Sequence, residues 1–287
     1  MMARCAIALA AAALSITSPG GGGPVPERAL HRLARVAELY RDNALGFACE
    51  ETIAYTGRTT GRLQFAYLFI RDDSGKLRDY RTKKTGKTAE ERSREVDLRD
   101  YNVPRFLASA YLFAFVFRSD RQPLYRFYAA GEDRIDGRSA MRVQFIPRNP
   151  IRKGLNDWVG YADIDRETSQ ILRVDAYTPE NWNLLVRRDA DVAAAEARKP
   201  QDDHPTYEIE RIVTEFGFEK NGMRFPSHVE ITTTQFTVLP GGAQDPYREN
   251  KLRTVTQDYS GFEFFSVRSS EEITRFVNGD GPLPLAK

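Results

Sequence analysis

Hydrophobic and polar residues alternate along residues 124–179 with the two-residue period that is typical of β-strands. Four runs carry this pattern: 124–130, 140–147, 158–165 and 170–177. An Asp136-Gly137 pair lies between the first two runs, and such a pair favours a tight turn between neighbouring strands. We therefore expect four short strands in this region, joined one after another by turns.

The same alternation occurs at both ends of the chain. Residues 47–57 and 61–71 predict a pair of strands connected by residues 57–61. Further strands are predicted over residues 207–218, 223–239 and 251–267, and Asn221-Gly222 favours a hairpin turn between the first two of these. Because no helical pattern separates successive strands, we expect an antiparallel sheet.

Helical spacing occurs in two other stretches. In residues 27–43, apolar side chains recur three or four positions apart and arginines occupy the opposite side, which predicts an amphipathic helix. Residues 103–117 show the same spacing with almost entirely apolar side chains, which predicts a helix that is mostly buried. The predicted fold class is α+β, with a strongly curved antiparallel sheet, or half-barrel, packed on both helices.

The N-terminus has the order of a secretory signal. Arg4 precedes a short apolar run, and small residues follow it before a glycine-rich break. We expect residues 1–20 to be a signal peptide, 21–26 a linker, 27–279 a single domain and 280–287 a tail. The alternative is a permanent membrane anchor, for which the apolar run is short. Within the domain, residues 187–204 are alanine-rich and charged, which predicts an exposed helix or a mobile flap between strands.

Composition and charge argue against several classes of function. The formal net charge of +2 is close to neutral, whereas a nucleic-acid-binding domain is expected to be clearly basic. Without the signal peptide, Cys49 is the single cysteine, so an intramolecular disulfide and a multi-cysteine metal site are both excluded. We expect Cys49 to be a small buried hydrophobe, with a reactive thiol as the alternative.

Candidate catalytic and metal-binding patterns are weak. His31, His204 and His228 have no partner at metal-ligand spacing. No acid, base and nucleophile occur together in a known motif. We therefore expect no enzymatic activity, no cofactor and no metal.

Several turns and strands together resemble the lipoprotein-localisation carrier superfamily, which includes the LolA/LolB-like and RseB-like periplasmic proteins. The resemblance lies in the signal peptide and leading helix, in residues 137–147 and 158–173, and in the run Gly222-Met223-Arg224-Phe225-Pro226. It implies an antiparallel half-barrel capped by helices, whose apolar concave face receives acyl chains or a lipoprotein signal. It also implies a periplasmic or secreted protein, expected here as a monomer that meets membranes only transiently.

One carboxylate stands out on a predicted apolar strand face. Glu51 alternates with Phe47, Cys49 and Ile53, and a carboxylate in such a place must be paired, protonated or near water. Pairing with a nearby arginine is one interpretation, and a polar anchor in a ligand cavity is the other. The predicted ligand-binding residues are Glu51, Phe65, Tyr67, Phe113, Phe127, Phe145 and Trp158, with core packing as the alternative role of the aromatic ones.

The resulting functional hypothesis is a non-catalytic periplasmic carrier that binds a lipid, an acyl chain or a lipoprotein. The alternative is an envelope interaction or sensing module without a bound small ligand, in which residues 187–204 would contact the partner protein.

Overall fold

The structure is a computed structural model that describes residues 22–42, 47–71, 77–83, 95–96, 114–148, 157–195, 204–220, 222–239 and 245–264. Its two α-helices are α1 (Glu27–Asp42) and α3 (Pro179–Ala193), and its two 3₁₀ turns are η2 (Ala114–Phe117) and η3 (Gln122–Leu124). Its strands are β1 (Phe47–Thr56), β2 (Gly61–Arg71), β3 (Leu77–Lys83), β4 (Tyr125–Ile135), β5 (Arg138–Pro147), β6 (Val159–Asp165), β7 (Ile171–Tyr177), β8 (Thr206–Glu215), β9 (Phe218–Lys220), β10 (Met223–Phe225), β11 (His228–Val238) and β12 (Tyr247–Phe264).

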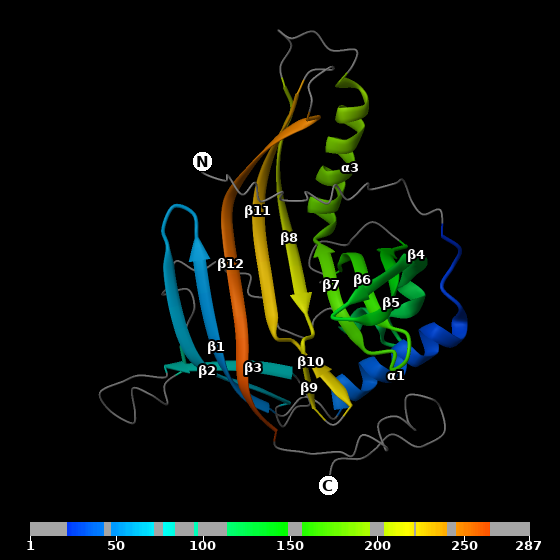
Figure 1. The fold of residues 1–287 in the computed structure, drawn as a ribbon, viewed down its shortest axis with the longest axis vertical. Coiled ribbons are helices and arrows are strands. Elements are labelled where there is room, and N and C mark those ends of the chain that lie inside the picture. The colour runs from blue at the N-terminus through cyan, green and yellow to red at the C-terminus, as the bar shows by residue number, and fades with distance from the viewer. Residues whose placement is uncertain are drawn as a thin grey trace, which may run out of the picture.

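Ten of the strands form one open antiparallel sheet (Figure 1). Their order is β3-β2-β1-β12-β11-β8-β7-β6-β5-β4, and every pair in it is antiparallel, as the alternation predicts. β9 and β10 form a separate hairpin around the predicted Asn221-Gly222 turn. The sheet does not close on itself, and the half-barrel curvature stays a prediction. Figure 1 shows the strand direction turning from β12 and β11, which run lengthwise, to β5 and β4, which lie across them.

Short segments lie against both edges of the sheet. On the outer side of β4, the Val25 N–H donates to the Phe127 carbonyl at 3.2 Å, and the Ala129 N–H donates to the Gly23 carbonyl at 3.0 Å. On the outer side of β3, the Val96 N–H donates to the Arg81 carbonyl at 2.8 Å. Unpaired edge strands are templates for association with other chains, so these segments limit that exposure. Residues 22–25, predicted as linker, are thus part of the sheet edge.

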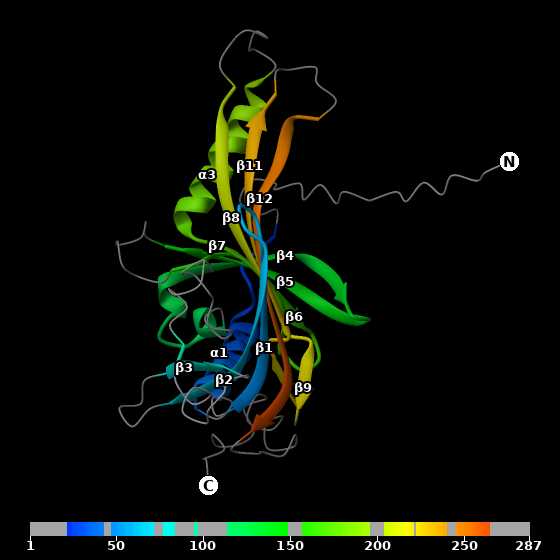
Figure 2. The ribbon, with the colours of Figure 1, turned by 90° about the vertical axis from the view of Figure 1, so that its left-hand side faces the viewer.

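The two helices pack on opposite faces of the twisted sheet. Figure 2 shows α3 beside the upper part of β8 and α1 below it. Val174, Ala176 and Ile212 belong to the main core together with α1, whereas Tyr177 and Ile209 pack with Leu185 of α3. Successive side chains of a strand point to opposite faces, so α1 and α3 must lie on different sides. We call the side that packs on α1 the core face.

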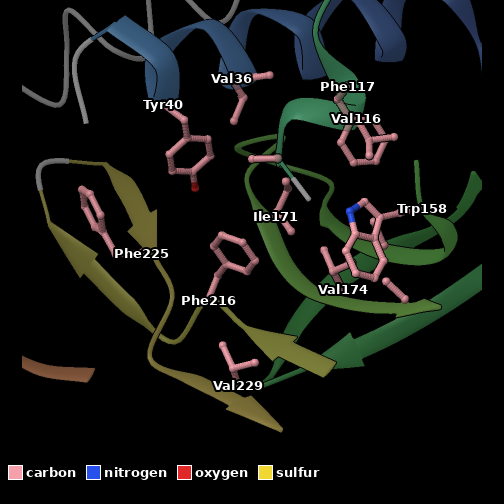
Figure 3. Packing of buried hydrophobic residues seen from close by; sticks show 14 of the residues in the cluster. Val36, Tyr40, Val116, Phe117, Trp158, Ile171, Val174, Phe216, Phe225 and Val229 are labelled. Carbon is pink, nitrogen blue, oxygen red and sulfur yellow. The ribbon is translucent and has the colours of Figure 1, made fainter. Parts of the chain in front are cut away.

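The core face is filled by apolar side chains from the helix and the strands. In Figure 3, Val36 and Tyr40 of α1 point toward Ile171, Phe216 and Phe225. Tyr40 is fully buried, and its hydroxyl donates to the Arg224 carbonyl at 2.6 Å. The amphipathic helix predicted for residues 27–43 is therefore confirmed, and its apolar stripe faces the sheet.

Two predicted segments differ from the structure or fall outside it. The segment predicted as an exposed helix or flap at residues 187–204 is partly helix α3, which begins eight residues earlier. The Thr178 hydroxyl caps the helix by accepting from the Asn181 N–H at 3.3 Å, and Leu185 and Arg188 are buried against the sheet. The predicted helix is thus present up to Ala193, although Arg188 within it is buried. Residues 196–203 lie outside the described residues. The helix begins earlier than predicted because the apolar side chains that anchor α3 lie upstream of the alanine-rich stretch.

The buried helix predicted for residues 103–117 lies mostly outside the described residues, and its last four residues form the 3₁₀ turn η2. The predicted signal peptide, residues 1–20, and the predicted tail, residues 280–287, also lie outside the described residues.

Gly160 of β6 gives a direct test of the packing between β6 and β7. A Cβ at this position would lie 2.0 Å from the Asp175 carbonyl oxygen of β7. We predict that Gly160→Ala lowers the free energy of unfolding by about 1–3 kcal/mol, the usual cost of overpacking. Gly23→Ala is the control, because a Cβ there meets nothing within 4 Å. Urea unfolding of both variants measures the difference. Equal free energies of unfolding would contradict the close packing of β6 against β7 at Gly160.

Candidate functional site

The structure divides the predicted ligand-binding residues into two groups. Glu51, Phe65 and Tyr67 lie on β1 and β2, whereas Phe127, Phe145 and Trp158 lie on or beside β4, β5 and β6. In the strand order, five strands separate β1 from β5, so the two groups lie at different ends of the sheet. All six residues are at most 7% exposed. Phe113 lies outside the described residues.

The group on β4 to β6 packs as an aromatic core around η2. The Phe117 ring lies 5.6 Å from that of Phe127 and 6.1 Å from that of Phe145, centroid to centroid. Tyr125 joins the cluster, and its hydroxyl accepts from the Trp158 N–H at 3.3 Å. Core packing accounts for these residues, and contact with a ligand stays a prediction.

The group on β1 and β2 surrounds a buried ion pair. Two nitrogens of Arg81 on β3 donate to the two carboxylate oxygens of Glu51, Nε to Oε2 at 2.5 Å and Nη2 to Oε1 at 2.9 Å. The guanidinium carbon lies 4.8 Å from the centre of the Tyr67 ring. Glu51 is 1% exposed and Arg81 is 7% exposed. Arg81 thus reaches across β2 to β1 on the core face, and the expected pairing of Glu51 with an arginine is present.

A glutamine and a tyrosine of β12 extend this ion pair into a network across four neighbouring strands. Gln257 Nε2 donates to Glu51 Oε1 at 3.1 Å and to the Tyr259 hydroxyl at 2.9 Å. Gln257 is fully buried. We call Glu51, Arg81, Gln257, Tyr259 and Tyr67 the polar cluster. In the sequence, Gln257 alternates with Val255 and Tyr259, a pattern that places a polar side chain on an apolar strand face. Arg81 lies in a charged segment, where no such pattern indicates its position.

Two polar atoms of this cluster lack a hydrogen-bond partner. Across the described part of the chain, the Tyr67 hydroxyl and Gln257 Oε1 are both buried and unpartnered. A buried polar atom without a partner is unfavourable by about 1–3 kcal/mol, so such atoms are rare in folded proteins. Each atom needs a polar group of a ligand, or a water molecule, as its partner.

Burial fixes the protonation of the groups around the ion pair. Burial raises the pKa of Tyr67 and of Tyr259 well above the ordinary value, so both hydroxyls keep their protons at physiological pH. Burial lowers the pKa of Arg81. The adjacent Glu51 carboxylate raises it by more than burial lowers it, so the net pKa is raised. Burial, together with Glu51, also raises the pKa of the Cys49 thiol, which argues against the reactive-thiol alternative.

An aromatic cluster continues from the polar cluster toward the end of β12. The Phe218 and Phe262 rings stack at 4.5 Å, and the Phe225 and Phe264 rings lie 4.6 Å apart. Gly261 has φ +64°, and β1 and β12 shift register at this point. The shift brings Phe264 opposite Phe47 on the core face. Phe218, Phe262 and Phe264 are only partly buried, so the cluster opens toward solvent.

A concave region lies between α1 and the turn that joins β6 to β7. It is a groove of about 400 Å³. Its lining residues are Pro26, Arg28, Ala29, Arg32, Leu33, Met141, Ile164, Asp165, Arg166 and Ser169. We call it the α1 groove. It combines an apolar floor with arginine side chains, a combination that the sequence did not predict because its parts come from three separate segments.

Asp165 holds the turn beside the α1 groove. Its Oδ1 accepts from the Glu167 N–H at 2.8 Å and from the Thr168 N–H at 3.1 Å, and its Oδ2 accepts from Arg138 at 3.1 Å. Burial raises the pKa of Asp165. The two backbone N–H groups and Arg138 together lower it by more than burial raises it, so the net pKa is lowered. Asp165 is therefore a structural carboxylate whose charge is already compensated.

Metal binding and membrane spanning find no support in the described part of the chain. No group of three or more His, Cys, Asp or Glu side chains there could hold a metal ion. In the same residues, no helix is both long and apolar enough to span a bilayer.

The buried ion pair yields a stability prediction. Arg81→Met leaves the Glu51 carboxylate buried and uncompensated, so the free energy of unfolding should fall by about 3–5 kcal/mol. The double variant Glu51→Leu/Arg81→Met removes both charges and should lose much less than the sum of the single changes. Arg62→Met, at an exposed position on β2, is the control. Urea unfolding of the wild type, of Arg81→Met, of Glu51→Leu, of the double variant and of the control measures these effects, and additive effects would contradict the coupling.

The lowered pKa of Asp165 yields a pH prediction. A group with a depressed folded-state pKa contributes stability above its ordinary value, near 4, and loses that contribution as the pH falls. Asp165→Asn should therefore lower the free energy of unfolding by about 1–3 kcal/mol at pH 7. The difference from the wild type should shrink toward pH 3. A constant difference in urea unfolding between these pH values would show that the charge is not the cause.

Neither a protein-family model nor a curated protein matches the chain. Among solved structures, a DUF1329 family protein from Desulfovibrio piger matches with a TM-score of 0.43 and 11% identity, covering 86% of this chain and 97% of that one. A putative outer membrane lipoprotein-sorting protein domain from Vibrio parahaemolyticus has a TM-score of 0.43 and 10% identity over the same shares. A LolA superfamily protein from Nitrosomonas europaea has a TM-score of 0.36 and 10% identity, covering 82% and 93%.

Crystal structures of MucB, one of them in complex with MucA, also match, with TM-scores of 0.24 to 0.26. One of the structural neighbours is thus a LolA superfamily protein, and another is a putative lipoprotein-sorting protein domain. Since all these TM-scores are below 0.5, what this chain binds has to be inferred from its own residues.

Proposed function

We propose that this protein is a non-catalytic binding protein of the bacterial envelope that takes up an amphiphile, such as a lipid or an acyl chain, at the β1–β2–β12 end of the core face. The observation that carries the proposal is the pair of unpartnered polar atoms, the Tyr67 hydroxyl and Gln257 Oε1, beside a buried ion pair. The polar end of the ligand meets these two atoms, and its apolar part lies against the neighbouring aromatic cluster.

The chemistry of the two clusters supports this orientation. The Tyr67 hydroxyl is a donor and Gln257 Oε1 is an acceptor, so a hydroxyl, carboxylic acid or amide group could bind both. The neighbouring aromatic rings offer a large apolar surface with few polar atoms, of which Phe218, Phe262 and Phe264 are partly open to solvent. Ligand sites generally combine such an apolar lining with a few placed polar groups.

The envelope location belongs to the same proposal. It follows from the predicted signal peptide in residues 1–20 and from the resemblance to periplasmic carriers. A concave half-barrel around the ligand, and a carrier role for a lipoprotein, are further parts of it.

A second candidate function, docking of an envelope protein, is favoured by a different observation. The α1 groove places arginines above an apolar floor and is separate from the polar cluster. Both functions can coexist in one protein, since the two regions share no residue.

Tyr67→Phe tests the amphiphile site with little risk to the fold. Because the Tyr67 hydroxyl has no partner among the described residues, its removal should leave the free energy of unfolding unchanged or raise it. If the hydroxyl binds the ligand, the affinity for a fluorescent fatty acid should fall by about three- to tenfold. Fluorescence titration of the mature protein measures the affinity.

Tyr125→Phe is the matched control at the other end of the sheet. Its hydroxyl accepts from the Trp158 N–H, so its loss should reduce stability but leave fatty-acid affinity unchanged. No binding of the fatty acid by the wild type, or equal affinity in Tyr67→Phe, would contradict the proposed site.

A further inference from the structure

The α1 groove carries an excess of uncompensated positive charge. Arg28 is exposed and, within the described residues, has no hydrogen-bond or ion-pair partner. Arg32 donates through Nη2 to the Glu167 carbonyl at 3.0 Å, and its Nε is buried without a partner. Arg166 forms an ion pair with Glu132. The carboxylate of Asp165 is already held by Arg138 and two backbone N–H groups.

The positions of Arg28 and Arg32 concentrate this charge on one side of α1. Residues four apart on a helix lie above one another on the same face, so the two guanidinium groups are neighbours. Arg28 lies in the first turn of α1, where the helix dipole adds partial positive charge. The α1 groove therefore presents two arginines of one helix face to an acidic group that enters it.

Apolar side chains form the other part of the groove. Leu33 of α1 is buried, and Met141 of β5 and Ile164 of β6 lie opposite it across the groove. Met141 and Ile164 are paired residues on neighbouring strands, so they form one continuous apolar patch. A ligand of the α1 groove thus needs a negative group next to an apolar one.

We propose that the α1 groove is a docking site for an acidic segment of a partner protein, in which a Glu or Asp side chain meets Arg28 and Arg32 and a neighbouring apolar side chain meets Met141 and Ile164. The groove is partly open to solvent. An acyl chain in such a groove would keep much of its apolar surface in water, which is unfavourable. A peptide can instead turn alternate side chains toward the groove and keep its polar backbone in water.

This docking site rests on the second candidate function, envelope-protein docking, and does not rest on the proposed amphiphile site. The two use different residues, and each can fail alone. The α1 groove would give the protein a specific partner whether or not a lipid occupies the core face.

The test is the affinity of the mature protein for a fluorescein-labelled decapeptide of alternating Glu and Leu, measured by fluorescence anisotropy. We expect saturable binding that weakens with added salt. Arg28→Glu should lower the affinity by about tenfold or more, because a charge-assisted bond becomes a repulsion. Since Arg28 is exposed and a Glu near a helix N-terminus is favourable, this variant should fold.

Arg248→Glu is the matched control, because it makes the same charge change at an exposed position of β12, away from the groove. Its affinity should stay close to that of the wild type. A peptide of alternating Lys and Leu should not bind. Equal affinities of Arg28→Glu and the wild type would overturn the proposal. Failure of the acidic peptide to bind would overturn it too. Binding of anionic phosphatidylglycerol vesicles that requires Arg28 would then assign the groove to a lipid headgroup.

Discussion

Coverage of one large apolar sheet face is the constraint on which the rest of the structure depends. Nine spacings of about 4.8 Å make a ten-stranded sheet roughly 43 Å wide, whereas a helix of 16 residues is about 24 Å long. Helix α1 therefore cannot cover the whole core face. Its contacts lie toward β5 to β8 and the β9–β10 hairpin, where Leu33 and Tyr40 are buried. Among the described residues, other side chains fill the core face at the β1–β2–β3 end.

At that end the chain uses aromatic rings and a buried ion pair. The Glu51–Arg81 pair is unusual in such a place, since taking two charges out of water costs several kcal/mol per ion before their attraction is counted. Arg81 offsets part of this by its bidentate contact and by lying over the Tyr67 ring. Replacing such a pair with hydrophobic residues is often neutral or stabilising, so stability alone does not explain it. Under the proposed function, the pair also serves as a polar anchor for a ligand.

The sequence predicts the elements of this fold better than it predicts their meeting points. The alternation around Val143, Phe145 and Ile164 and the Asn221-Gly222 turn lead to the correct antiparallel strands, because local periodicity and turn chemistry decide these features. The position of Glu51 on an apolar face also follows from alternation, and so does its need for a cation. Its partner, Arg81, could not be predicted, because β3 lies in a charged segment and pairing across β2 depends on long-range register.

Local sequence patterns also fail to predict the α1 groove and the start of α3. The α1 groove unites Arg28, Met141 and Asp165, which are far apart in the chain, so no local pattern indicates it. Helix α3 begins earlier than the segment predicted from composition, because its Thr178 cap and the buried Leu185 precede the alanine-rich residues. The two groups of predicted ligand residues, around Tyr67 and around Phe145, share a strand face but not a site, since alternation gives the face and not the distance along the sheet.

Purification of the mature protein from its own host, followed by native mass spectrometry, tests the central claim most directly. The claim is that the core face near Tyr67 and Gln257 holds an amphiphile. The predicted result is a population of protein with one bound lipid-sized molecule that organic solvent releases and whose mass and fragments identify a lipid or fatty acid. A spectrum that contains only the mass of the mature polypeptide, under conditions that preserve the complex of a known lipid carrier, would contradict the claim.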